Sequence, residues 1–141
     1  MATIRQQVLI DAPMRSVWNA ITTPEGIARW WATSARVDGR EGGRVALVHL
    51  VDGESVEERG MIHRFRPTAT FELLLDGVGR GPDGASRSSS IQFQLGRGAG
   101  ETKLHVIVTG ASLDDDEARV AQEAAWKDRL LRLRDGLEAS A

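Results

Sequence analysis

A chain of 141 residues with a formal net charge of −2 is long enough for one folded domain and carries no basic surplus that would recruit nucleic acid. The absence of cysteine excludes disulfides, thiolate nucleophiles and cysteine metal sites, and it is typical of the reducing cytoplasm. With 41% hydrophobic and 27% charged residues, and no apolar run as long as a membrane span or a secretory signal, the sequence predicts a single cytoplasmic domain over residues 1–141 without membrane insertion. Arginine supplies 16 of the 18 basic residues, a bias that we interpret as that of a GC-rich bacterial genome.

The first segment predicts a strand followed by a short helix. Residues 3–10 are rich in strand-forming types, and Asp11 then stands where it is expected to cap a helix. Apolar residues next recur at the i, i+3, i+4, i+7 spacing of one helix face: Met14, Val17, Trp18 and Ile21.

A second short helix is predicted directly afterwards, with Thr23 as its cap and Pro24 at its start. Ile27, Trp30 and Trp31 fall on adjoining parts of one face of this helix. Neighbouring residues on a helix point about 100° apart. Both tryptophan rings can therefore be buried only if the core surrounds the helix end, and otherwise one ring faces something other than core.

Five strand-like segments follow, separated by turn-forming residues: 44–51, 56–65, 69–75, 90–95 and 102–108. The last two alternate apolar and polar residues, as half-buried antiparallel strands do. Gly60 is expected to mark a bulge or a close backbone approach. Glu57, Glu58 and Arg59 are expected on a solvated strand face, and the glycine- and serine-rich residues 76–89 are expected to form a long loop.

The C-terminal part predicts one long helix over residues 114–138. Its clearest apolar stripe consists of Trp126, Leu130, Leu133 and Leu137. This order of elements indicates an α+β fold in which a curved antiparallel sheet of about six to seven strands wraps around the C-terminal helix.

Several stretches resemble one known family. They are "IDAPMRSVWNAITTPEGIARWW" near the start, the Gly42–Gly43 pair, Gly60 before an apolar pair, "GAGETKLHVIVTG" at 98–110 and "AWKDRLLRL" at 125–133. With these motifs the chain resembles the START-like, helix-grip superfamily (SRPBCC), in the branch named for the C-terminal domain of the activator of the heat-shock-protein-90 ATPase. The resemblance implies a cavity between the sheet and the long helix, which members use for lipid or hormone carriage, polyketide cyclisation or co-chaperone contacts.

No motif in the chain indicates catalysis, a metal or a cofactor. The three histidines lack the H-E-x-x-H spacing of a zinc site, and the serines at 86–90 lack the G-x-S-x-G nucleophile elbow. The glycine-rich stretches lack the spacing of phosphate-binding loops and are typical of hairpin turns. We therefore assign no catalytic residue, metal ligand or cofactor.

The candidate ligand-cavity residues combine an aromatic and apolar wall with a few polar groups. They are Trp30, Trp31, His49, Met61, His63, Phe71, Phe93, Arg119, Glu123, Trp126 and Leu130. His49 and His63 reach the cavity if their strand faces look inward, and otherwise they are exposed or satisfied in the structure. Arg119 and Glu123 continue the Trp126 stripe, so they orient a ligand, form an internal salt bridge or are solvated at the helix start.

Three functions remain open at this point. The favoured one is binding of a small hydrophobic or amphipathic molecule, such as a lipid or an aromatic metabolite, because the apolar walls are clearer than any catalytic group. The second is a cyclase, dehydratase or hydrolase with an acid and a base such as His63 and Glu123, and an inward-facing histidine–carboxylate pair would favour it. The third is a co-chaperone-like or stress-response interaction module, which a large exposed apolar patch would favour. A homodimer fits any of them, because sheet edges are expected to be exposed.

Overall fold

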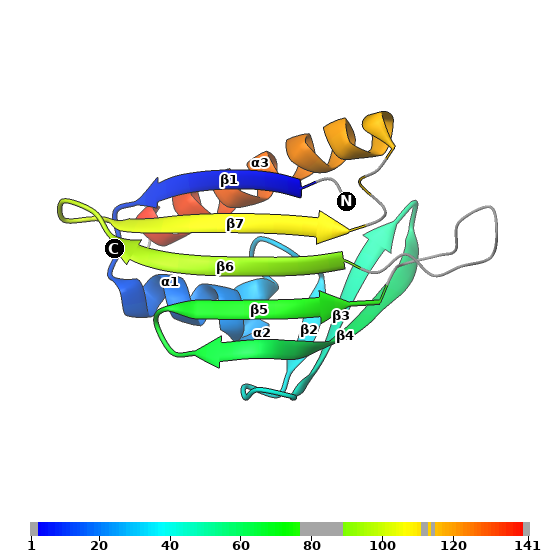
Figure 1. The fold of residues 1–141 in the computed structure, drawn as a ribbon, viewed down its shortest axis with the longest axis horizontal. Coiled ribbons are helices and arrows are strands. Elements are labelled where there is room, and N and C mark those ends of the chain that lie inside the picture. The colour runs from blue at the N-terminus through cyan, green and yellow to red at the C-terminus, as the bar shows by residue number, and fades with distance from the viewer. Residues whose placement is uncertain (1–2, 77–88, 111–112, 114, 140–141) are drawn as a thin grey trace.

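The computed structural model describes residues 3–76, 89–110, 113 and 115–139, so nearly all of the loop expected at 76–89 lies outside the described residues. The described strands form one antiparallel sheet in the order β1-β7-β6-β5-β4-β3-β2 (Figure 1). In chain order the described elements are β1 (Thr3–Ile10), α1 (Met14–Thr22), α2 (Pro24–Ile27), β2 (Ser34–Val37), β3 (Arg44–Val51), β4 (Glu54–Arg66), β5 (Thr70–Leu75), β6 (Ser89–Arg97), β7 (Thr102–Gly110) and α3 (Asp116–Ala139).

The three helices lie on the same side of the sheet, which curves around them (Figure 1). Helix α3 packs mainly against β1 and also touches α1. The α+β helix-grip architecture predicted from the order of elements is therefore confirmed.

The core fills the space between the sheet and the helices. On β6 and β7, Ile91, Phe93, Leu104 and Val106 are buried, while the residues between them face outward, as the apolar–polar alternation predicts. Trp126, Leu130 and Leu133 of α3 are buried opposite these strands. Each such side chain contributes about 1.5–3 kcal/mol by leaving water, which is why the stripe and the alternation determine the layer arrangement.

Of the two helix caps predicted from the sequence, one is confirmed and one is wrong. The hydroxyl oxygen of Thr23 accepts a hydrogen bond from the Gly26 N–H at 3.0 Å, as predicted. Asp11 does not cap α1, because Pro13 in the extended conformation is the residue that precedes the first turn, two positions later. The backbone N–H of Asp11 instead donates to the carboxylate of Glu138, which ties the end of β1 to the last turn of α3.

Strand β2 was not predicted from the sequence. It has only four residues, of which Ala35 and Val37 are the apolar ones, and it forms one edge of the sheet by pairing with β3. Such a short edge strand is held by backbone pairing to its neighbour rather than by an apolar run of its own.

Gly60 marks a close backbone approach, as expected from its position inside a strand. A Cβ atom at this residue would lie 2.1 Å from the carbonyl oxygen of Leu74 and 2.9 Å from Cα of Leu75. The absence of a side chain at Gly60 therefore lets β4 and β5 pair closely at this point.

Candidate functional site

Both tryptophans of the adjacent pair are buried. The helix α2 ends at Ile27, so Trp30 and Trp31 lie in the turn that follows it, with exposed fractions of 3% and 8%. Their rings stack with centroids 5.5 Å apart, and the indole N–H of Trp30 donates to the carbonyl oxygen of Ala20 at 2.8 Å. The core therefore surrounds the end of α2, the first of the two arrangements that the sequence left open.

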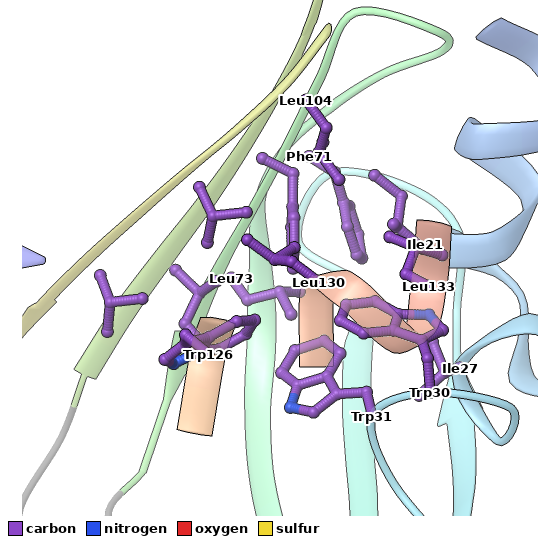
Figure 2. Close-up of a cluster of buried hydrophobic side chains, with 14 of the residues drawn as sticks. Ile21, Ile27, Trp30, Trp31, Phe71, Leu73, Leu104, Trp126, Leu130 and Leu133 are labelled. Atoms are coloured by element: carbon purple, nitrogen blue, oxygen red, sulfur yellow. The ribbon is translucent and has the colours of Figure 1, made fainter. Parts of the chain in front are cut away.

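The two rings join the sheet to α3 through an aromatic cluster. Phe93 of β6 lies 5.7 Å from Trp31 and 6.2 Å from Trp30, and Trp126 of α3 lies 5.4 Å and 6.4 Å from the same two rings, all measured between ring centroids. Figure 2 shows the three tryptophans together with Leu130 in this cluster. Edge-to-face and tilted pairs of this kind contribute about 0.5–1.5 kcal/mol each beyond the burial of their area.

A cavity of about 790 Å³ opens beside this cluster, between α3, the end of α2 and the inner face of the sheet. Trp30, Trp31 and Trp126 form its aromatic wall, with apolar residues of β3, β4, β6 and β7 beside them. Among the described residues, the titratable groups that line it are Arg29, His49, Glu58, Arg129 and Arg132.

His49 and Glu58 form a hydrogen-bonded pair on the inner face of the sheet. His49 Nε2 lies 3.2 Å from Glu58 Oε1, and the exposed fractions of the two side chains are 20% and 18%. Glu58 was expected on a solvated face, and this is wrong because three consecutive strand residues cannot share one face. Glu57 and Arg59 do face outward and pair with each other there.

Arg129 of α3 lines the same cavity as this pair. Its guanidinium carbon is 5.0 Å from the centroid of the Trp126 ring, within the range of a cation–π interaction. Burial lowers the pKa of Arg129, the carboxylate of Glu58 opposes this effect, and the charge of Arg132 adds to it. Arginine nevertheless stays protonated at neutral pH, so a positive charge lines the cavity.

Two candidates from β4 lie on the other side of the sheet. Met61 is 48% exposed and His63 is also exposed. The pairing of β4 with β5 shifts between Ile62 and Arg64, and this irregularity turns Phe65 inward against Trp18 while His63 stays outside. Met61 borders a larger hollow of about 1380 Å³, formed mainly by residues of β2 to β5, that shares only Ser89 with the aromatic-walled cavity.

The remaining candidates are separate from the cavity lining. Arg119 pairs with Asp116 in the first turn of α3, at 2.8 Å between Nη2 and Oδ1. Glu123 is exposed, and its backbone carbonyl accepts a hydrogen bond from the side-chain amide of Gln6. Phe71 and Leu130 belong to the packed core, as does Phe93.

The structure thus brings Trp30, Trp31, His49 and Trp126 together at one cavity, and adds polar residues that the sequence reasoning did not select. Glu58 could have been found from its alternation with Val56 and Ile62 along the strand. Arg129 could have been found because it follows Trp126 by three residues, on the same side of the helix.

Within the described residues, no group of three or more histidine, aspartate and glutamate side chains is placed to hold a metal ion. None of the helices in the described part of the chain combines the length and the apolar character that crossing a membrane requires.

Comparison with known proteins gives a family and several related structures. The family model AHSA1, described as activator of Hsp90 ATPase homolog 1-like protein, matches residues 11–138. No curated protein matches the chain. Protein MLL2253 from Mesorhizobium loti is similar in structure, with a TM-score of 0.83 at 19% identity over 99% of both chains.

Two further structures share the fold. The Aha1 dimer from Colwellia psychrerythraea has a TM-score of 0.76 at 22% identity, over 98% of this chain and 97% of that one. DynU16, a protein of the dynemicin biosynthetic locus, has a TM-score of 0.80 at 22% identity, over 98% of this chain and 48% of that one. The family match spans nearly the whole sequence, and the chain therefore belongs to the family of activator of Hsp90 ATPase homolog 1-like proteins.

Proposed function

We propose that the protein binds a small amphipathic molecule in the cavity between the sheet and α3. The observation that carries this proposal is one cavity that combines the aromatic wall of Trp31 and Trp126 with the polar residues His49, Glu58 and Arg129. Ligand sites of small molecules are typically apolar clefts of about 300–1,000 Å³ with a few convergent polar groups. The volume of about 790 Å³ falls within this range.

The position of the packed core limits where the ligand lies. Phe71, Phe93 and Leu130 belong to the packed core between sheet and helix and do not line the cavity. The apolar part of a ligand therefore lies along the tryptophan wall at the cavity, not in the centre of the fold. The dynemicin-locus origin of DynU16 supports a small-molecule partner only by analogy of fold.

The His49–Glu58 pair favours a second candidate, acid–base catalysis on the bound molecule. The histidine–carboxylate distance of 3.2 Å is within hydrogen-bond reach, and the pair borders the same cavity. His49 would exchange a proton with the ligand while Glu58 holds the imidazole. This arrangement replaces the His63–Glu123 pair considered from the sequence.

A surface-acting interaction module receives less support. Large exposed apolar residues of the described part lie on separate elements, with Leu9 on β1, Leu50 on β3 and Val120 on α3. Met61 and Leu74 are direct cross-strand neighbours, but two side chains make a small patch. We further propose a homodimer, because β1 and β2 are the two edges of the sheet and the Colwellia psychrerythraea relative is a dimer.

Native mass spectrometry of gently purified protein tests these proposals together. We expect a stoichiometric extra mass that organic extraction releases, and a mass of two chains for the dimer. The extracted compound is then returned to the apo protein, where binding should change tryptophan fluorescence, and conversion to a new mass would support catalysis. A bare protein mass, with no fluorescence change across a panel of lipids and aromatic metabolites, would count against a ligand-binding function.

A further inference from the structure

We propose that the molecule bound in this cavity is an amphipathic organic anion whose carboxylate or similar oxyanion binds Arg129 while its aromatic or apolar body lies against Trp31 and Trp126. This inference rests on the proposed function and adds the chemical class of the ligand. It depends on three observations: the environment of Arg129, the charge of the cavity lining, and the position of the aromatic wall.

Arg129 is a half-buried arginine of α3 with no ion pair among the described residues. On the same helix, Arg119 pairs with Asp116 and Arg134 pairs with Asp135. Within the described residues, no hydrogen bond or ion pair holds the guanidinium of Arg129, which contacts the Trp126 ring. A guanidinium has five N–H donors, and no unpartnered side-chain nitrogen is fully buried among the described residues, so the donors of Arg129 remain accessible to a ligand. A ligand oxyanion would supply two acceptors in the geometry that a guanidinium fits best.

The charges around the cavity favour an anionic ligand. Three arginines, Arg29, Arg129 and Arg132, line the cavity, against the single carboxylate of Glu58 among its described lining residues. That carboxylate is already hydrogen bonded to His49. The described lining is therefore positive, although the chain as a whole has a net charge of −2.

The aromatic wall of Trp31 and Trp126 indicates where the apolar part of the ligand lies. Trp126 and Arg129 are three residues apart on α3, so the ring and the guanidinium lie on one side of the helix. Trp31 contacts Trp126 with ring centroids 5.4 Å apart. An aromatic body lying along these two indoles would bring an anionic substituent to Arg129.

A matched pair of fluorescent probes tests the proposal. One probe is 8-anilinonaphthalene-1-sulfonate, and the other is N-phenyl-1-naphthylamine, which has the same aryl amine skeleton without the sulfonate. We expect the sulfonate to bind the wild-type protein about tenfold more tightly or better, since a charge-assisted hydrogen bond is worth about 1.5–3 kcal/mol. Arg129→Gln should remove this preference, so that the ratio of the two affinities falls to about one.

Lys127→Gln is the matched control, because it removes one positive charge from an exposed position of the same helix outside the cavity lining. It should preserve the preference for the sulfonate. Arg129→Lys keeps the charge and should retain part of the preference, which separates loss of charge from loss of packing.

The outcomes distinguish this inference from the proposed function. Equal affinity of the wild-type protein for the two probes would overturn the anion proposal and leave ligand binding intact. This ratio is measured on the wild-type protein, so it tests the anion proposal even if a variant fails to fold. A preference that survives in a folded Arg129→Gln variant would also overturn it. Failure of both probes to bind would count against the proposed function itself.

Discussion

Replacing Phe93 with alanine is expected to lower the free energy of unfolding by about 3–5 kcal/mol, the usual cost of deleting a fully buried aromatic ring. Phe93 is completely buried and contacts Phe71, Trp30, Trp31 and Trp126 at centroid distances from 5.7 to 6.2 Å. Its removal leaves a cavity where β6 meets the end of α2 and α3. Urea denaturation followed by far-UV circular dichroism measures the loss without relying on the tryptophans that the mutation disturbs.

Gln94→Ala is the control for this experiment. Gln94 is the next residue on β6 and is exposed on the outer face of the sheet, so its truncation should change the free energy of unfolding by less than about 0.5 kcal/mol. If Phe93→Ala cost no more than Gln94→Ala, the aromatic cluster would not be the centre of the core.

Glu58→Gln is expected to change stability and ligand affinity in opposite directions. The variant loses the charged hydrogen bond to His49 and the attraction to Arg129, which should cost about 1–2 kcal/mol of unfolding free energy. It also removes the one carboxylate among the described lining residues, which repels an anion. Affinity for 8-anilinonaphthalene-1-sulfonate should therefore rise about three- to tenfold, as expected from Coulomb interactions in a partly desolvated site.

The expected rise in affinity does not depend on a change in the protonation of Arg129. Glu58 raises the pKa of Arg129, so its replacement lowers that pKa further, but a guanidinium remains protonated at neutral pH. Glu57→Gln is the control, because Glu57 is exposed on the outer face, where it pairs with Arg59. A Glu58→Gln variant that binds the sulfonate more weakly, while Glu57→Gln leaves it unchanged, would contradict the account of the cavity charge.

Much of the fold could be predicted because its signals are local. The residues of β1 carry their own strand pattern, Thr23 and Pro24 define the start of α2, and the spacing of Trp126, Leu130 and Leu133 defines the buried side of α3. The predicted bounds of β1 and the predicted cap of α2 agree with the structure. The resemblance carried by the sequence motifs also gave the correct family.

The candidate site could be predicted only in part because it depends on register between distant segments. The shift between Ile62 and Arg64 reverses which residues of β4 look inward, and alternation alone places His63 and Phe65 on one face. The pairing of His49 with Glu58 requires the register of β3 with β4. Arg119 and Glu123 do not line the cavity, because the side chain of Arg119 pairs with Asp116 and Glu123 is exposed with its backbone beside Gln6 of β1.

The most direct test of ligand binding between the sheet and α3 is an NMR titration that follows the four tryptophan indole N–H signals during addition of N-phenyl-1-naphthylamine. This probe is neutral, so the result does not depend on the anion proposal. Trp31 and Trp126 line the cavity, whereas Trp18 packs away from it against Phe65 and Phe71. The account predicts that the signals of Trp31 and Trp126 shift with saturation while that of Trp18 stays in place. A saturable shift of Trp18 with Trp31 and Trp126 unmoved would contradict it.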